Sequence, residues 1–318
     1  KIIFNGEFAA SINAITATDT ITVVEELKFS GGTAAVLNSG TLNVTGNIIT
    51  ANTASGTASG GTGSIHICGN NNQTFTGTAN PAKGALCNIK INKPSGTLSL
   101  IGNITIGTYE WKYVKGTVDA GSSTVAFFGW GTVNCGTPAL NMAFNNFHIV
   151  SGDITLTGAL NVKNNLTVNQ AHGLLTNGYD VNVGGNFIAP GIVVTSPAMI
   201  TLNGTGSQQL SMNAQLYNLK IDKPSGKVYL NGFNLTLNNK LVLKRGLIVC
   251  PGTTMVKFNP NTIIEGGSNQ SCVVGPVWRD GYTAFTFPVG DTVAGDSSVY
   301  HPISLPAVPS GYIYTARY

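Results

Sequence analysis

Apolar and polar residues alternate along most of this chain, in runs of three to five residues. In residues 154–157, 160–163 and 166–168, Ile, Leu or Val alternates with Thr, Asn or Lys. A period of two is that of a β-strand, whose side chains point alternately to its two faces. The runs end at Thr-Gly, Asn-Asn or Asn-Gly pairs, which turn the chain at low steric cost. Very short strands with frequent turns predict a coil of stacked rungs rather than a sandwich of long strands.

One thirteen-residue pattern occurs twice, as NIKINKPSGTLSL at residues 88–100 and NLKIDKPSGKVYL at residues 218–230. A third, degenerate copy, NFHIVSGDITL, lies at residues 146–156. Repetition of this kind indicates a solenoid, in which similar units stack. The Lys-Pro-Ser-Gly segment predicts a corner, because proline cannot donate to a strand ladder and glycine permits unusual backbone angles. We expect the lysines to stay in water and four apolar side chains to point inward: Ile89, Ile91, Leu219 and Ile221.

The predicted fold is therefore all-β, a right-handed parallel β-helix (solenoid) with a distinct β-rich C-terminal segment. The repeats divide the chain into an N-terminal β entry segment at residues 1–60, a solenoid at 61–275 and a C-terminal β segment at 276–318. The solenoid contains three degenerate modules, at residues 61–122, 123–197 and 198–275.

Charge and hydropathy limit the kinds of partner that this chain can bind. Only 9% of the residues are charged and the net charge is +4, so the chain lacks the basic stripe that a phosphate backbone requires. Nucleic acid is excluded as a partner on this basis. No run of about 18 apolar residues occurs, so no membrane-spanning helix is expected.

Catalytic and metal-binding patterns are also missing from the sequence. Glycan-cleaving β-helices need carboxylates that converge on one face, and the 13 acidic residues here are scattered singly. The four histidines are far apart and have no metal-ligand spacing. Asp291 and Asp296 are close enough to share a calcium ion, with a solvated loop as the alternative. We expect no enzyme activity, no cofactor and no metal site.

The segment YEWKYVK at residues 109–115 alternates three aromatic rings with charged side chains. Rings on one face of a strand can stack on sugars, which makes Tyr109, Trp111 and Tyr113 a candidate carbohydrate platform. The alternative is that these rings fill a wide part of the solenoid core.

Five cysteines leave at least one thiol unpaired. Cys68 and Cys87, and likewise Cys250 and Cys272, are separated by about one rung of chain. Stacking of each pair on adjacent rungs would allow a disulfide in an oxidising exterior, and stacked reduced thiols are the alternative.

Three stretches carry a resemblance to a known group of proteins: residues 204–248, residues 273–291 with the segment FPVG, and YHPISL at residues 300–305. They resemble the large secreted, repeat-rich β-solenoid surface and adhesin-like proteins of Bacteroidota, which are type IX secretion substrates. The resemblance implies an extracellular or cell-surface location. It also implies O-glycosylation at Thr20 and Thr292, because Asp-Thr-Ile and Asp-Thr-Val look like the acceptor used in that group.

The ends of the chain predict association. Residues 1–29 are strand-like and apolar, and the aromatic strands at 282–290 and 311–318 have no evident partner in the sequence. Unpaired solenoid ends add strands from neighbours, so we expect self-association or pairing with neighbouring domains, together with contacts to surface carbohydrate.

The first functional hypothesis is therefore a non-enzymatic extracellular structural protein: a surface stalk, adhesin or self-assembling filament subunit. The alternatives are a carbohydrate-binding or carbohydrate-active β-helix protein and a phage tail spike or fibre.

Overall fold

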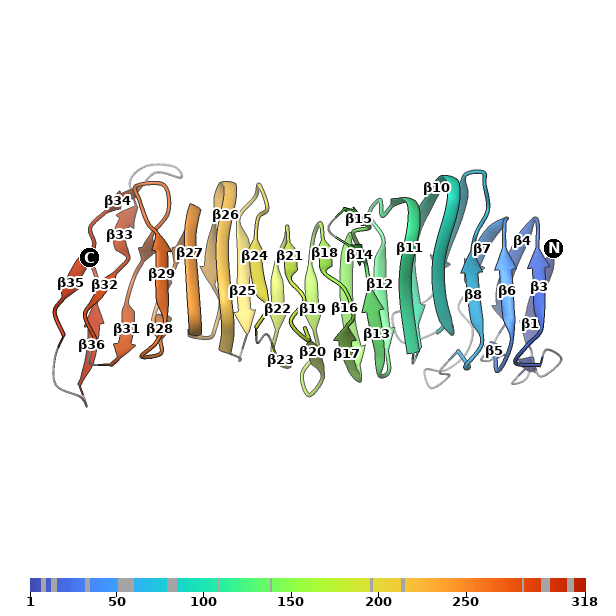
Figure 1. Ribbon diagram of the computed structural model, residues 1–318, viewed down its shortest axis with the longest axis horizontal. Coiled ribbons are helices and arrows are strands. Elements are labelled where there is room, and N and C mark those ends of the chain that lie inside the picture. Colours follow the sequence, from blue (N-terminus) through green and yellow to red (C-terminus); the bar gives the residue numbers. More distant parts are fainter. Residues whose placement is uncertain are drawn as a thin grey trace. The chain divides into compact units, whose positions relative to one another are not determined.

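The computed structural model describes residues 1–6, 10–12, 16–31, 35–50, 60–78, 85–107, 109–137, 139–194, 197–212, 215–281, 283–292, 298–307 and 312–318. Within these ranges the chain is all-β, without a helix, and is arranged as a β-solenoid of about 11 turns (Figure 1). The predicted parallel β-helix is confirmed. Accordingly, these ranges hold no helix of the length and hydropathy needed to cross a membrane.

The chain divides into two compact units. Unit 1 is Lys1–Asn161 with His172–Leu174, and unit 2 is Val162–Ala171 with Leu175–Tyr318. The division falls inside the module predicted at residues 123–197.

Unit 1 is built from parallel ladders in which each strand pairs with its equivalent one turn later. One ladder runs through β4, β7, β9, the second half of β10, β12 and β16. A second ladder runs through β3, β6, β8, the first half of β10, β11, β13 and β17. The strands are β1 (Ile2–Gly6), β2 (Ala10–Ile12), β3 (Thr20–Val23), β4 (Glu26–Gly31), β5 (Ala35–Leu37), β6 (Thr41–Val44), β7 (Asn47–Thr50), β8 (Ser64–Ile67), β9 (Gln73–Thr78), β10 (Asn88–Ile106), β11 (Tyr109–Asp119), β12 (Thr124–Phe128), β13 (Gly131–Asn134), β14 (Gly136–Thr137), β15 (Leu140–Asn141), β16 (Asn146–Ser151) and β17 (Asp153–Leu156). Strands β18 (Leu160–Val162) and β20 (Gly173–Leu175) lie where the two units divide.

Unit 2 repeats this parallel construction through β22, β25, β26, β27 and β30, and through β21, β24, β26, β27 and β29. Its strands are β19 (Leu166–Val168), β21 (Val181–Val183), β22 (Phe187–Ala189), β23 (Ile192–Val194), β24 (Met199–Leu202), β25 (Gln208–Met212), β26 (Gln215–Leu230), β27 (Leu235–Val249), β28 (Val256–Phe258), β29 (Ile263–Gly266), β30 (Val273–Val274), β31 (Val277–Asp280), β32 (Phe285–Phe287), β33 (Val289–Thr292), β34 (Ser298–Tyr300), β35 (Ile303–Leu305) and β36 (Ile313–Ala316).

The apolar side of the alternation faces the core, as the sequence predicts. Ile89, Ile91, Leu219 and Ile221 are all buried, at no more than 1% exposure. The ladder between β10 and β11 is interrupted between Asn92 and Thr97, which confirms the predicted corner. Gly96 has a φ of 69°, an angle that glycine adopts far more readily than other residues.

Asparagine side chains continue the hydrogen bonding between turns. The Oδ1 atom of each accepts a backbone N–H from the next turn, since asparagine bonds readily to main-chain groups at bends. The donor–acceptor pairs are Thr74 N to Asn47, Thr97 N to Asn72, Asn186 N to Asn165, Gln209 N to Asn186 and Met255 N to Asn234, all at 2.8–3.0 Å. The high asparagine content therefore serves the stacking of turns.

The C-terminal segment changes from parallel to antiparallel pairing. Strand β36 pairs with β31, β35 with β32 and β34 with β33, each antiparallel. The expectation that the C-terminal aromatic strands lack partners within the chain is therefore wrong. The missed signal is the return of the chain on itself, which the sequence pattern of the parallel rungs does not contain. At the other end, no strand among those described pairs with the outer edge of β1 or β3.

Candidate functional site

The corner at Lys93 places a lysine where the sequence predicts solvent. Lys93 is only 1% exposed, and so is Lys223, which overturns for these two lysines the expectation that the motif's lysines stay in water; Lys90 and Lys220 are half-buried. Its Nζ donates to Gly69 O at 2.7 Å, Asn71 O at 2.9 Å and Gln73 Oε1 at 2.6 Å. These three oxygens use all three ammonium donors, so the charge is solvated by the protein instead of by water.

Gln73 completes this corner by bonding in two directions. Its Oε1 also accepts from Gly69 N at 3.1 Å, and its Nε2 donates to Val44 O at 3.1 Å on the preceding turn. Gln73 is 2% exposed, so the lysine and the glutamine form one buried polar network. We call this network the Lys–Gln corner.

The same corner occurs in unit 2. Lys223 Nζ donates to Gly204 O at 2.8 Å, Gly206 O at 2.7 Å and Gln208 Oε1 at 2.6 Å. Gln208 Nε2 donates to Val183 O at 3.0 Å, as Gln73 does to Val44 O. The missed signal was in the sequence: a glutamine stands four residues after a glycine in both GNNNQ (69–73) and GTGSQ (204–208).

The degenerate middle copy has a different corner. Gln73 pairs with Leu98 and Gln208 with Val228, but Gly131 occupies the equivalent place opposite Ile154. Only one residue separates Gly129 from Gly131, where three separate Gly69 from Gln73. The corner is therefore shorter and contains neither the lysine nor the glutamine.

Trp130 lies at the tip of this short corner and is 67% exposed. By register its neighbour on the next turn is Asp153, because Gly131 pairs with Ile154. Gly152, beside Asp153, donates its N–H to His172 Nδ1 at 3.0 Å, and both residues belong to unit 1. An exposed indole thus has a carboxylate and an imidazole on the following turns, a grouping that the sequence reading did not identify.

The predicted aromatic platform is not on the surface. Trp111 is 0% exposed and Tyr113 3%, so neither ring can stack on a sugar from solvent. Trp111 packs in a core cluster of rings, 5.3 Å from Phe144 and 6.4 Å from Phe75 between ring centroids. The side chain of Tyr109 lies outside the described residues. The predicted alternation is present, but it directs Trp111 and Tyr113 into the core, which is the alternative interpretation given above.

The cysteines are free thiols, and the register does not stack them. Asn88 pairs with Ser64, so Cys87 lies beside the residue before Ser64, about 16 Å along the strand from Cys68. Val273 pairs with Ile248, which leaves Cys272 about 10 Å from Cys250 by the same count. Both separations exceed the Cα distance of about 7 Å that a disulfide can span, so both predicted pairings are wrong. Burial raises the pKa of Cys87 and of Cys250 to about 12, which keeps these thiols protonated and unreactive.

The remaining predicted sites lie on the surface or outside the described residues. Thr20 and Thr292 are exposed, so O-glycosylation of both stays a prediction. Asp296 falls outside the described residues, and so does the predicted choice between a calcium site at Asp291 and Asp296 and a solvated loop. Within the part of the chain that the structure describes, no cluster of three His, Cys, Asp or Glu side chains could hold a metal ion.

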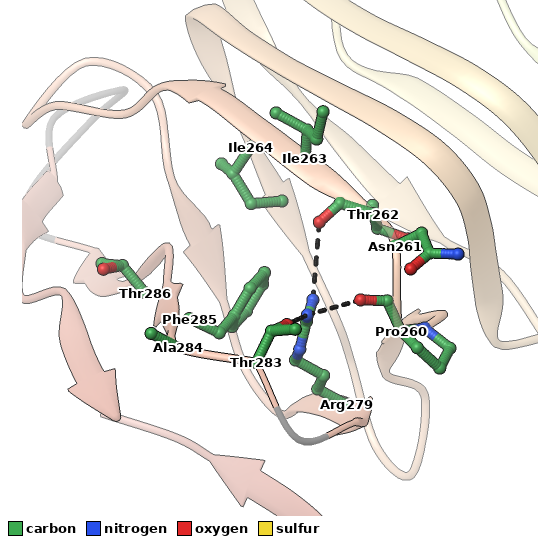
Figure 2. A pocket seen from close by; sticks show the side chains of 10 residues that line it. All are labelled: Pro260, Asn261, Thr262, Ile263, Ile264, Arg279, Thr283, Ala284, Phe285 and Thr286. Carbon is green, nitrogen blue, oxygen red and sulfur yellow. Dashed lines mark hydrogen bonds between the residues drawn. The ribbon is translucent and has the colours of Figure 1, made fainter. Parts of the chain in front are cut away.

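A cavity with a volume of about 450 Å³ lies in unit 2 beside the buried Arg279 (Figure 2). The turn at residues 260–264 forms one wall and residues 283–286 form the other, with Arg279 of β31 between them. Arg279 Nη2 donates to Pro260 O at 2.6 Å and to Thr283 Oγ1 at 2.8 Å. The sequence reading gave Arg279 no role.

Aromatic packing holds the Arg279 guanidinium in place, with its carbon 3.9 Å from the centre of the Phe285 ring. Burial lowers the pKa of this guanidinium, but arginine stays protonated at neutral pH in proteins. The cavity therefore has a fixed positive charge in its wall.

Comparison with known proteins adds no relative: no family model matches the sequence, no curated protein matches it, and no solved structure matches the fold. The functional assignment therefore depends on the chain's own residues.

Proposed function

We propose that this chain is a non-enzymatic extracellular structural protein that serves as a surface stalk, adhesin or filament subunit. The observation that carries the proposal is the Lys–Gln corner. Two residues of the repeated pattern, Lys93 and Lys223, are buried and fully hydrogen-bonded within the scaffold. Repetition here preserves a stacking geometry rather than a reactive group, which is typical of a solenoid selected for its shape.

The edge of the first turn supports the self-assembly part of the proposal. Among the strands that the structure describes, β3 pairs only with β6, and it presents Ile21 at 39% exposure; Val24, just beyond its end, is 68% exposed. An open, apolar strand edge adds strands from other chains unless charge or a cap protects it. A second copy, or a neighbouring domain, would pair there.

The test is the oligomeric state. Light scattering after size exclusion, with negative-stain microscopy, should show association that increases with protein concentration. The double variant Ile21→Lys/Val24→Lys should remain monomeric with an unchanged unfolding temperature, because charges at a strand edge oppose pairing. Ile101→Lys, which changes a 45% exposed residue elsewhere in unit 1, is the matched control and should still associate.

Two outcomes would contradict the proposal. A wild-type chain that stays monomeric at high concentration removes the self-assembly part. Release of reducing sugars from a polysaccharide by the purified chain would replace the structural assignment with a glycan-cleaving one.

A second candidate, carbohydrate binding, is favoured by Trp130. A tryptophan with 67% exposure leaves much of a large apolar ring in water, and indole faces stack on the apolar faces of sugar rings. Asp153 and His172 could bond to sugar hydroxyls beside it. The candidate platform is thereby moved from the buried Trp111, in the module at residues 61–122, to the short corner of the next module, at residues 123–197, where the lysine is absent.

Glycan-array screening followed by calorimetry tests this candidate. Trp130→Ala should abolish binding of any glycan that the wild type retains, and Trp130→Phe should retain part of it. Leu140→Ala, at another exposed apolar position in unit 1, should bind as the wild type does. Equal binding by Trp130→Ala would exclude this corner as the sugar site.

A further inference from the structure

The cavity beside Arg279 has a positive charge in its wall without a negative partner. Arg279 is 4% exposed, and no ion pair to it occurs among the residues that the structure describes. A buried charge is costly unless it is paired or fully hydrogen-bonded. The other buried cations, Lys93 and Lys223, meet that requirement with three oxygens each.

Arg279 does not use its donors as fully. A guanidinium has five N–H groups. The two of Nη2 bond to Pro260 O and Thr283 Oγ1, and Nη1 reaches Thr262 O only at 3.4 Å, longer than an ordinary hydrogen bond. Buried Nε has no acceptor at all within the described structure. Arg279 therefore retains hydrogen-bonding capacity after its structural contacts are made.

The cavity that Arg279 lines is suited to a small ligand. Its volume of about 450 Å³ falls within the range of small-molecule pockets, about 300–1,000 Å³. Thr286 and Asn261 add polar groups to the wall, whereas Ile263, Ile264 and Phe285 add apolar ones. Figure 2 shows the guanidinium end of Arg279 beside the open space that these two kinds of side chain border.

We propose that this pocket binds a small molecule through an oxyanion, a carboxylate, sulfate or phosphate, with Arg279 as the anion-binding residue. Oxyanions accept charge-assisted hydrogen bonds from guanidinium N–H groups, and the fixed positive charge of Arg279 attracts them. The apolar part of the ligand packs against Ile264 and Phe285. This binding is independent of the structural role proposed above, since it uses residues outside the Lys–Gln corners and the edge of β3.

Calorimetric titration of the full chain with galacturonate, sulfate and phosphate, each against sodium chloride of equal ionic strength, tests the proposal. At least one of the three should bind saturably with a stoichiometry of one, and the identity of that anion separates a sugar acid from an inorganic group. Arg279→Lys should weaken binding at least tenfold, because a lysine has only three donors, too few to keep the contacts to Pro260 O, Thr283 Oγ1 and Thr262 O and still bond to the ligand. Arg317→Gln, which removes an exposed arginine elsewhere in unit 2, should bind as the wild type does.

A second variant keeps the test decisive if Arg279 substitutions disturb folding. Ala284 is exposed and lines the cavity, so Ala284→Trp fills the space without removing a buried contact. This variant should unfold at the wild-type temperature and lose anion binding. Failure of all three anions to bind saturably would overturn the proposal, and so would wild-type affinity in Ala284→Trp.

Discussion

The corners at Lys93 and Lys223 belong to different units but have the same hydrogen bonds, whereas the corner at Gly152 in the middle copy has none of them. In the long corners three residues form the bend, and two carbonyl oxygens of the bend accept hydrogen bonds from the lysine. A lysine supplies three donors at once. In the short corner one residue, Trp130, stands between Gly129 and the next strand.

The comparison shows that the lysine and the glutamine depend on the length of the corner. Both are present where three residues separate the glycine from the next strand, and both are absent where one does. In the long corners the lysine and the glutamine are buried in the interior. The short corner needs none there and presents Trp130 to solvent.

The largest expected effect is the loss of a buried lysine. Lys93→Met should destabilise unit 1 by about 3 kcal/mol, because Gly69 O and Asn71 O would lose the ammonium donor and Gln73 Oε1 would keep only Gly69 N. Urea unfolding followed by tryptophan fluorescence measures this, since Trp111 lies in the core of unit 1.

Lys90→Met is the matched control, because Lys90 stands on the same strand but is partly exposed. It should change the free energy of unfolding by less than about 0.5 kcal/mol. Equal effects of the two substitutions would mean that the corner contributes no more than an ordinary surface position.

The next effect concerns coupling within the corner. Gln73→Leu alone should cost about 2 kcal/mol, since it removes an acceptor from Lys93 and a donor from Val44 O. Combined with Lys93→Met, the cost should be about 1–2 kcal/mol below the sum of the two, because residues of one network do not act independently. A double-mutant cycle in urea measures this coupling, and strict additivity would contradict the description of one network.

A smaller effect is expected at the residue before the buried lysine, which differs between the two long corners. Burial raises the pKa of Asp222, but hydrogen bonds from Lys244 and Arg245 outweigh it and lower this pKa to about 2, below the ordinary 3.8. At the corresponding place in unit 1 stands Asn92, whose buried Oδ1 has no partner in the described structure.

Because the pKa of Asp222 is lower in the folded protein, the carboxylate stabilises unit 2 above about pH 4, and this contribution is lost as the pH falls towards 2. Asp222→Asn should cost about 1 kcal/mol at neutral pH, a value kept small by the exposure of Lys244 and Arg245. Scanning calorimetry of the wild type and the variant, from about pH 2 to neutral pH, measures this loss of stability. An unchanged pH profile in the variant would show that these ion pairs contribute nothing.

The smallest effect is expected at the short corner. Trp130→Ala should alter the free energy of unfolding by less than about 0.5 kcal/mol, because the indole is mostly exposed and the turn depends on the glycines beside it. Urea unfolding measures it under the conditions used for Lys93→Met. A loss comparable to that of Lys93→Met would assign Trp130 to the scaffold and not to a binding surface.

Much of the fold could be predicted from the sequence because period-two alternation is a local property. It identified Ile89, Ile91, Leu219 and Ile221 as core residues, and the Lys-Pro-Ser-Gly segments as corners. The same alternation placed the 109–115 rings on one face of a strand, but it could not tell which face was the inner one. Trp111 is buried because neighbouring turns bring Phe75 and Phe144 against it.

The candidate sites were harder to predict, because they depend on which residues of different turns become neighbours. Cysteine spacing close to one turn suggested stacking, but the number of residues per turn varies with corner length, so Cys68 and Cys87 fall about five residues out of register. Arg279 and its cavity depend on a turn at residue 260 and a loop at residue 283 that close around β31. The antiparallel return of β36 onto β31 has the same origin.

By itself the sequence determined the β-solenoid class, the inward and outward faces of its clearest strands, and the positions of the repeated corners. These follow from side-chain alternation and from the backbone preferences of proline and glycine, which act over a few residues. Only the tertiary structure decided that Lys93 and Lys223 are buried, that Trp130 rather than Trp111 faces solvent, and that a positive charge borders a cavity. Burial and hydrogen bonding are set by chain segments about 20 residues or more apart, and the distances between those segments depend on how each turn closes on the next.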